Sequence, residues 1–565
     1  MAIYRNARIE RINVTDIVRV GPAPVSELAR ERRVRMRDGV QLATDVYLPD
    51  GDESPGDTIL IRLPYDKCGP YTFIPLVAEY FMEHGYRVVA QDVRGKFRSD
   101  GEALLFVNEA RDGYDTIDWI VQQGWSNGSV AMWGDSYYGY TQWAAVSTQH
   151  PALKAIAPRV TGTQLGEPVR DPGAIRPVEW AVTYLYPLTY FHSQDGFAWE
   201  LDSSRRPYSA QAEEVMSAIG ARSISYDQWF PSAVHLPRFV DGSPFDARPV
   251  PVLHTIGLWD NCAPLSWADV AELESRPAWA LNHYLRIEAM DHESYYFEDG
   301  PERRTESRTD DQIRSELPRM LDPSIAFFEV FVRGNGRPDD IPRVAWSLAG
   351  TPGMRVAERW PPSGLREWVV YAAADGSLGV AQAEESVVEW VHDPDDLVPS
   401  SAANAFGFLM ERPDEAPLGE RHDVVVFTAG AQATPVDLVG PARARVEVQS
   451  DGPVMDVFVR LLDVAPDGSA LRIARGQAQV NRPPIVGPTE VTIDLGQVSY
   501  RLAPGHQLRV HVSSSDHPEY LAQPGTGEHP WSARETRVNR QRLTVGGPHG
   551  LELTLSVLDT KGTAS

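Results

Sequence analysis

A serine between two glycines offers the clearest chemistry in this sequence. In SVAMWGDSYYGYTQW, Ser136 stands between an apolar run typical of a buried strand and a segment of helical composition. A serine on a tight strand-to-helix turn exposes its hydroxyl, and the first helical turn directs backbone N–H groups toward it. Gly134 precedes the serine by two places, but Tyr138 lies two places beyond it, and the next glycine is Gly139. The segment predicts a nucleophile, with a helix-capping serine as the structural alternative.

A serine hydroxyl needs a neighbouring general base, and in this arrangement the acid and the histidine follow the serine along the chain. Asp260 comes just after the apolar run VLHTIGL, and His292 comes after YLRIEAM. We expect His292 to accept the proton of Ser136 while Asp260 holds the imidazole. The competing candidates for these two roles are Asp291, His283 and His254. The two competing histidines lie in strand-like runs, where a core role is favoured.

The surrounding segments predict the fold that would position these residues. Apolar runs alternate with amphipathic segments over residues 1–162 and 247–343, which indicates an α/β-hydrolase core with a largely parallel sheet. Residues 163–246 lack such runs and are interpreted as an inserted helical cap. Residues 344–565 contain short alternating strands separated by turn residues, which predicts a C-terminal all-β sandwich or jelly roll.

Shorter patterns give local predictions within the core. RVRMRDGVQLATDVYLP predicts a hairpin that turns at Asp38-Gly39, and LVAEYFMEHG predicts a helix closed by Gly85. SIAFFEVFVRG is interpreted as the last helix of the core. Asp92 and Arg94 are polar residues that follow a strand, and we interpret them as a buried pair that fixes a loop.

Composition excludes several other classes of function. The formal charge of −25 opposes binding to nucleic acid. The two cysteines, Cys68 and Cys262, are too few for a disulfide framework or a metal cluster, and we interpret them as free thiols. No apolar stretch is long enough to span a membrane, and no signal-peptide pattern is present. The sequence predicts a cytoplasmic protein without cofactor or metal.

These residues carry a resemblance to a known family. The segments RLPYDK, GYRVVAQDVRGKFRSDGE, GDSYYGYTQW, LWDN and LAPGHQLRVHVSSSDHP resemble the cocaine esterase and X-Pro dipeptidyl peptidase family of α/β-hydrolases, also called CocE/NonD hydrolases. That family has the serine motif G-x-S-Y-x-G, which matches this sequence. The resemblance implies an oxyanion hole formed by the hydroxyl of Tyr65 and the backbone N–H of Tyr137. It also leaves a homodimer open.

The resemblance does not identify the substrate. An ester of a small organic molecule is one hypothesis, and an amide, cleaved by a β-lactam acylase or an X-Pro aminopeptidase, is the other. A sugar-binding protein without activity is disfavoured, because the catalytic elements are all present. The amide hypothesis needs carboxylates near the pocket, and the cap contains Glu167, Asp171, Glu179, Asp195 and Glu200. The aromatic candidates for the substrate pocket are Trp143, Trp180 and Tyr184, with Phe406 and Phe408 by resemblance.

Overall fold

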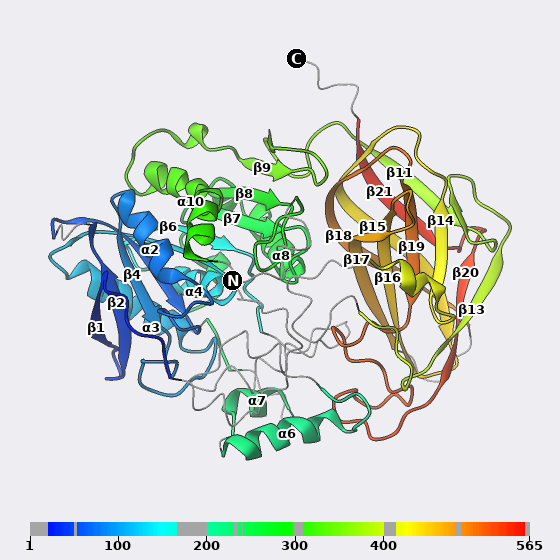
Figure 1. The fold of residues 1–565 in the computed structure, drawn as a ribbon, viewed down its shortest axis with the longest axis horizontal. Coiled ribbons are helices and arrows are strands. Elements are labelled where there is room, and N and C mark those ends of the chain that lie inside the picture. The colour runs from blue at the N-terminus through cyan, green and yellow to red at the C-terminus, as the bar shows by residue number, and fades with distance from the viewer. Residues whose placement is uncertain are drawn as a thin grey trace.

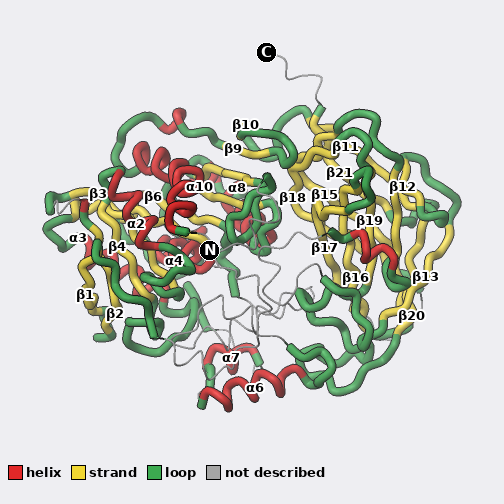
Figure 2. Tube along the Cα trace, viewed as in Figure 1, coloured by secondary structure: helices red, strands yellow, loops and turns green. Residues whose placement is uncertain are grey.

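The computed structural model describes residues 21–49, 53–166, 201–220, 222–230, 236–239, 241–298, 309–400, 414–481 and 487–559. Figure 1 shows an α/β part and an all-β part side by side, with the short helices α6 and α7 at the edge of the molecule. The trace in Figure 2 separates the helix-rich half from the strand-rich half in the same way. The predicted fold class is therefore confirmed.

A ten-stranded sheet forms the framework of the α/β part. Its spatial order is β1-β2-β4-β3-β5-β6-β7-β8-β9-β10, and the strands from β4 to β9 run parallel. The strands are β1 (Ala29–Arg35), β2 (Gln41–Tyr47), β3 (Gly56–Leu63), β4 (Arg87–Asp92), β5 (Ser126–Asp135), β6 (Leu153–Arg159), β7 (Val252–Gly257), β8 (His283–Glu288), β9 (Val344–Ser347) and β10 (Met354–Ala357). This sheet continues beyond residue 343, where the sequence pattern changed.

Helices cover both faces of this sheet. The helices of this part are α2 (Ile74–Glu83), α3 (Glu109–Val121), α4 (Ser136–Ser147), α8 (Ala263–Glu274), α9 (Pro277–Ala280) and α10 (Asp310–Phe331). Two further helices, α6 (Tyr208–Ile219) and α7 (Ile224–Trp229), lie away from the sheet at the edge of the molecule (Figure 1). Ile59 and Ile61 of β3 lie in the same buried cluster as residues of α2 and α10, whereas Leu60 lies in a cluster with residues of α3 and α4. Successive side chains on a strand point to opposite faces, so both faces must be apolar.

The predicted hairpin and helices of this part are present, although one helix differs in length. β1 and β2 form an antiparallel hairpin, and Gly39 in its turn has a positive φ of 93°. Helix α2 ends just before Gly85, as expected. Helix α10 is longer than predicted because it begins at a capping box of Thr309 and Gln312, and it contains two prolines. No helix among the described residues is long and apolar enough to cross a membrane.

The all-β part is a second sheet of eleven strands with its own core. Its order is β13-β20-β15-β21-β11-β12-β14-β19-β16-β17, and β18 pairs with β15. The strands are β11 (Leu365–Ala372), β12 (Ser377–Gly379), β13 (Ser386–His392), β14 (Val425–Ala429), β15 (Val436–Ser450), β16 (Val454–Val464), β17 (Ala470–Asn481), β18 (Thr489–Leu502), β19 (Gln507–Ser513), β20 (Asn539–Val545) and β21 (Glu552–Leu558). Alternating buried residues of β15 and β21 contribute to this core.

The two parts meet beside the loop that follows β7. The indole N–H of Trp259 donates to the carbonyl oxygen of Arg472 on β17 at 3.1 Å, and its ring contacts Tyr500 on β18. The β domain also reaches the cap helices, since Trp531 Nε1 lies 2.9 Å from the hydroxyl of Tyr226 on α7. The all-β domain therefore supports both the cap and one edge of the hydrolase core.

Candidate active site

Ser136 occupies a sharp turn between β5 and α4. Strand β5 ends at Asp135, α4 begins at Ser136, and Ser136 has a φ of +52°, a left-handed conformation that is unusual outside glycine. A Cβ on Gly134 would collide with the ring of Tyr138, and a Cβ on Gly139 would lie 2.6 Å from Thr161 Cγ2. The two glycines therefore allow the helix to pack closely after the turn, and the serine hydroxyl is held at the end of the strand.

The three residues predicted for catalysis lie within hydrogen-bond distance of one another. His292 Nε2 is 3.0 Å from Ser136 Oγ, and His292 Nδ1 is 2.6 Å from Asp260 Oδ1. Asp260 follows β7 and His292 follows β8, so adjacent parallel strands deliver both side chains to the same edge of the sheet. This arrangement allows proton transfer from the serine to an imidazole whose orientation the carboxylate fixes.

The competing candidates have other partners. Asp291 Oδ1 accepts the backbone N–H groups of Glu293 and Tyr295, which shapes the loop around the histidine. His283 Nδ1 lies 2.8 Å from Glu274 Oε1. His254 is buried in β7, and burial holds its pKa well below the usual value, so it is a neutral core residue.

The electrostatic environment favours the protonated form of His292. Burial lowers the pKa of His292, but the neighbouring Cys262 and the carboxylate of Asp260 outweigh it, and the pKa is raised well above its usual value. The backbone N–H of Cys262 also donates to Asp260 Oδ1 at 2.8 Å. Asp260 is thus oriented by its own loop while it stabilises the imidazolium that forms during proton transfer.

One cluster among the described residues contains metal-ligating side chains. Ligand atoms of Asp260, Cys262 and His292 all lie within 4.8 Å of one another. A metal ion held there would replace the Asp260–His292 hydrogen bond and remove the base from Ser136. The chemistry of this cluster is therefore better explained by proton transfer than by a resident cation.

A small cavity of about 30 Å³ adjoins the serine. Its walls are formed by Tyr65, Tyr71, Thr72, Phe73, Asp135, Ser136, Tyr138, His292, Glu293, Ser294 and Met320. Two of these are carboxylates that sequence reasoning missed: Asp135 lies 2.9 Å from Arg159, and Glu293 accepts the hydroxyl of Tyr71 at 3.0 Å. Their positions next to Ser136 and His292 in the sequence are the signal that could have identified them.

The two predicted oxyanion donors lie near this cavity. The ring of Tyr65 makes edge contacts with Tyr71 and Tyr138, at centroid distances of 5.5 and 6.1 Å. Tyr137 is the second residue of α4, and the N–H groups of a first helical turn have no partner within the helix. The side chain of Tyr137 points elsewhere, because its hydroxyl donates to Glu109 and accepts the N–H of Phe106, each at 2.9 Å.

Of the five aromatic residues predicted to line the pocket, the structure describes one. Trp143 was wrong as a pocket residue: it is fully buried in the core, where its ring contacts Phe245, His254 and Trp279. Trp143 lies two helical turns beyond the serine, about 10 Å further along α4 from the end of β5, and it packs in the buried cluster between the helix and the sheet. The other four candidates, Trp180, Tyr184, Phe406 and Phe408, lie outside the described residues, as do the five cap carboxylates.

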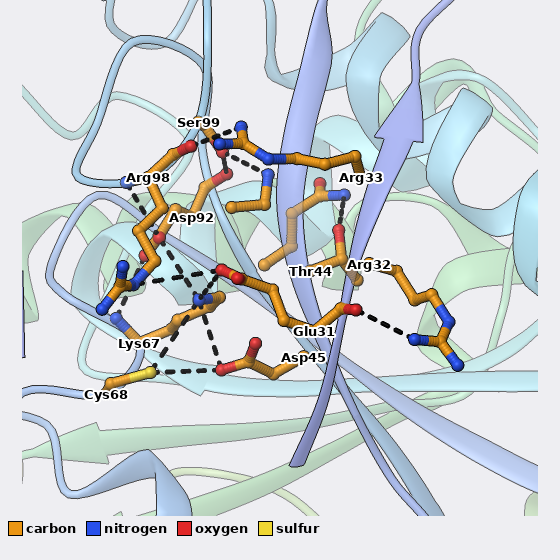
Figure 3. A network of polar contacts seen from close by, with 12 residues as sticks. Glu31, Arg32, Arg33, Thr44, Asp45, Lys67, Cys68, Asp92, Arg98 and Ser99 are labelled. Carbon is orange, nitrogen blue, oxygen red and sulfur yellow. Dashed lines mark hydrogen bonds and ion pairs between the residues drawn. The ribbon is translucent and has the colours of Figure 1, made fainter. Parts of the chain in front are cut away.

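The predicted pair of Asp92 and Arg94 was also wrong in its partners. Arg94 forms ion pairs of 2.6 Å with Asp112 and 2.7 Å with Asp38. Asp92 is instead 3.6 Å from the ammonium of Lys67, within the buried network that Figure 3 shows. Asp92 is the last residue of β4, whereas Arg94 lies in the turn beyond the strand, so the alternation of the strand does not keep the two side chains together.

This geometry defines the class of protein. A parallel sheet that presents a serine at a strand-to-helix turn, followed by an aspartate and a histidine after later strands, is the arrangement of a serine hydrolase of the α/β-hydrolase type.

Comparison with known proteins identifies the family within that class. The X-Pro dipeptidyl-peptidase (S15 family) profile matches residues 38–292, and the X-Pro dipeptidyl-peptidase C-terminal non-catalytic domain profile matches residues 335–552. Cocaine esterase of Rhodococcus sp. (strain MB1 Bresler) is 29% identical over 546 residues, which cover 87% of this chain and 92% of the esterase. The chain belongs to the cocaine esterase and X-Pro dipeptidyl peptidase family, and it is a serine hydrolase.

Solved structures support the fold over nearly the whole chain. An aminopeptidase from the marine sediment archaeon Thaumarchaeota archaeon superposes with a TM-score of 0.79 at 24% identity, covering 95% of this chain and 98% of that one. An α-amino acid ester hydrolase superposes with a TM-score of 0.74 at 23% identity and the same coverage. These two relatives share the architecture of an α/β core and an all-β domain.

Proposed function

We propose that this chain is a carboxylesterase that cleaves esters of small organic molecules. The observation that carries the proposal is the series Asp260–His292–Ser136, with contacts of 2.6 and 3.0 Å, which opens on the cavity that Tyr65 lines. The similarity of the chain to a cocaine esterase, over 92% of that enzyme, supports an ester substrate.

The reaction follows from the positions of these groups. Ser136 Oγ attacks the ester carbonyl while His292 Nε2 takes its proton, and Asp260 stabilises the resulting imidazolium. The hydroxyl of Tyr65 and the N–H of Tyr137 stabilise the tetrahedral oxyanion, an effect worth about 3–4 kcal/mol per donor. His292 then protonates the leaving alcohol, and an acyl-serine remains. Water, deprotonated by His292, attacks the acyl-serine and releases the carboxylic acid.

An amide substrate is the second candidate, and a specific observation favours it. Glu293 is a buried carboxylate in the wall of the cavity, where it could pair with a substrate ammonium. Asp135 is a weaker candidate, because Arg159 already balances its charge. The matched family profile is named for a peptidase, which agrees with this alternative.

Matched substrates distinguish the two candidates. We expect turnover of short-chain and aromatic p-nitrophenyl esters, with kcat/KM on X-Pro anilides at least a hundredfold lower, equivalent to about 2.7 kcal/mol. Ser136→Ala, assayed beside the native enzyme, should abolish both activities. Higher kcat/KM on the anilides would replace the esterase proposal with the peptidase one.

A further inference from the structure

Two residues beyond Tyr65, the side chain of Lys67 is completely buried among carboxylates (Figure 3). Its ammonium lies 3.2 Å from Asp45 Oδ2, 3.6 Å from Asp92 Oδ2 and 3.6 Å from Glu31 Oε1. Burial alone would lower the pKa of Lys67, but the charges of Asp92 and Asp45 outweigh it, and the pKa is raised. Lys67 therefore remains a cation inside the protein.

The main chain around Lys67 is fixed by the same carboxylates. The backbone N–H of Lys67 donates to Asp92 Oδ1 at 3.1 Å, so one carboxylate holds both the backbone and the side chain of this residue. Cys68 Sγ lies 3.1 Å from Asp45 Oδ2. Asp66 closes the segment by accepting the N–H groups of Cys68 at 3.0 Å and of Ala23 at 2.6 Å.

These contacts tie the segment to two strands of the sheet. Asp45 lies on β2 and Asp92 ends β4, and the two strands are antiparallel neighbours. Tyr65 is the second residue after the end of β3, which runs parallel to β4 with Leu63 opposite Asp92. The backbone that carries the tyrosine is thus held on one side by its own strand and on the other by the Lys67 network.

A buried network of charges is not needed to fill this part of the core. Burying ions costs desolvation free energy, and apolar residues of similar volume often stabilise a protein as well or better. Its distinctive property is directional: hydrogen bonds and charges fix the segment in one conformation. An oxyanion donor needs that fixation, because its contribution depends on a hydroxyl placed to within about 0.5 Å.

We propose that Lys67, together with Asp45 and Asp92, is a positioning residue that holds the Tyr65 hydroxyl at the oxyanion site. The inference rests on the proposed function, in which Tyr65 is an oxyanion donor. Lys67 itself is buried and does not line the cavity. Its effect on the reaction is therefore exerted through Tyr65.

A double-mutant cycle tests this dependence. Tyr65→Phe should lower kcat on a p-nitrophenyl ester about a hundredfold with little change in KM. Lys67→Met should lower kcat at least tenfold. The double variant should match Tyr65→Phe within about threefold, since a tyrosine without its hydroxyl has no donor left to misplace. Multiplied losses in the double variant, or a native kcat in Lys67→Met, would overturn the proposal.

Lys67→Met leaves two buried carboxylates without their cation, so a charge-balanced variant is needed in case it fails to fold. Asp45→Asn combined with Lys67→Met removes one charge of each sign, and it should show the same dependence on Tyr65. Arg460→Met is the matched control, because Arg460 and Asp516 form an equally buried ion pair of 2.8 Å in the β domain. That control should lower the melting temperature while kcat stays within twofold of the native value.

The rate of fluorophosphonate labelling provides a readout that does not need ester turnover. Ser136 Oγ forms a bond to phosphorus, its proton passes to His292 and fluoride leaves, while the phosphoryl oxygen occupies the oxyanion site. If the native enzyme cleaves no ester but its labelling shows the same coupling between Tyr65 and Lys67, the substrate proposal fails and the positioning proposal stands. Independent effects on labelling would contradict the positioning role itself.

Discussion

At the scale of single residues, the site combines a constrained serine with a histidine that readily holds a proton. Ser136 has its left-handed backbone conformation at the point where its hydroxyl meets His292. Residues held in such conformations cluster at functional sites, because the surrounding structure compensates for the strain. Here the close packing permitted by Gly134 and Gly139 provides that support.

The raised pKa of His292 predicts the acid side of the pH profile. General base catalysis requires a neutral imidazole, so kcat/KM must fall as the pH falls through the pKa of His292. Because that pKa is raised above 6.5, the midpoint of the acid limb should lie above pH 6.5. Cys262→Ala removes one cause of the increase and should move the midpoint down, whereas Cys68→Ala should leave it unchanged. A native midpoint at or below 6.5 would contradict this assignment.

At the scale of elements, the approach of α4 to β6 determines where the serine stands. Gly139 lies where a Cβ would be 2.6 Å from Thr161 Cγ2 and 3.2 Å from the carbonyl oxygen of Arg159. Both neighbours belong to or follow β6, which is a parallel neighbour of β5. The helix therefore packs against the chain beyond the next strand at a distance that only glycine permits.

Gly139→Ala should accordingly destabilise the protein and displace the elbow. Overpacking of this kind costs about 1–3 kcal/mol, which should lower the denaturant midpoint and reduce kcat together. Gly124→Ala is the control, because a Cβ there would meet nothing within 4 Å and should leave both quantities near native. Urea unfolding and ester kinetics on the two variants provide the comparison. Equal stability of the two would show that α4 can shift without cost.

At the scale of the whole molecule, the β domain should make stability depend on pH. Asp456 on β16 is buried, and burial raises its pKa to about 7, although Gln479 Nε2 donates to it at 2.9 Å. The unfolded chain releases this proton near pH 4, whereas the folded chain retains it to about pH 7. The free energy of unfolding should therefore fall as the pH rises between these values.

Asp456→Asn tests this contribution. The variant keeps an acceptor for Gln479 and cannot ionise, so it should raise the melting temperature relative to native more at pH 8 than at pH 5. Asp494→Asn, at an exposed position on β18, should show no such difference between the two pH values. Calorimetry of the three proteins at both pH values measures the effect. An equal shift at pH 5 and pH 8 would show that Asp456 is not protonated in the folded protein.

The sequence predicted the residues whose roles follow from order along a parallel sheet. Ser136, Asp260 and His292 each come after a strand-like run, and parallel strands bring such positions to one edge. The contacts of Trp143 and of Asp92 are made with segments distant in the sequence, and local patterns do not determine such contacts. The sequence did not predict the burial of Lys67, because lysine is ordinarily exposed and the three carboxylates that surround it come from distant segments.

The contacts of Trp259 with β17 and β18 have a consequence for any attempt to shorten or recombine this chain. Trp259 immediately precedes Asp260, so its partners Arg472 and Tyr500 share in supporting the carboxylate. A hydrolase core without the β domain would expose the indole of Trp259, and the loop that holds Asp260 against His292 would lose this support. Chimeras in the family should therefore take the loop after β7 and the contacting surface of β17 and β18 from the same parent protein.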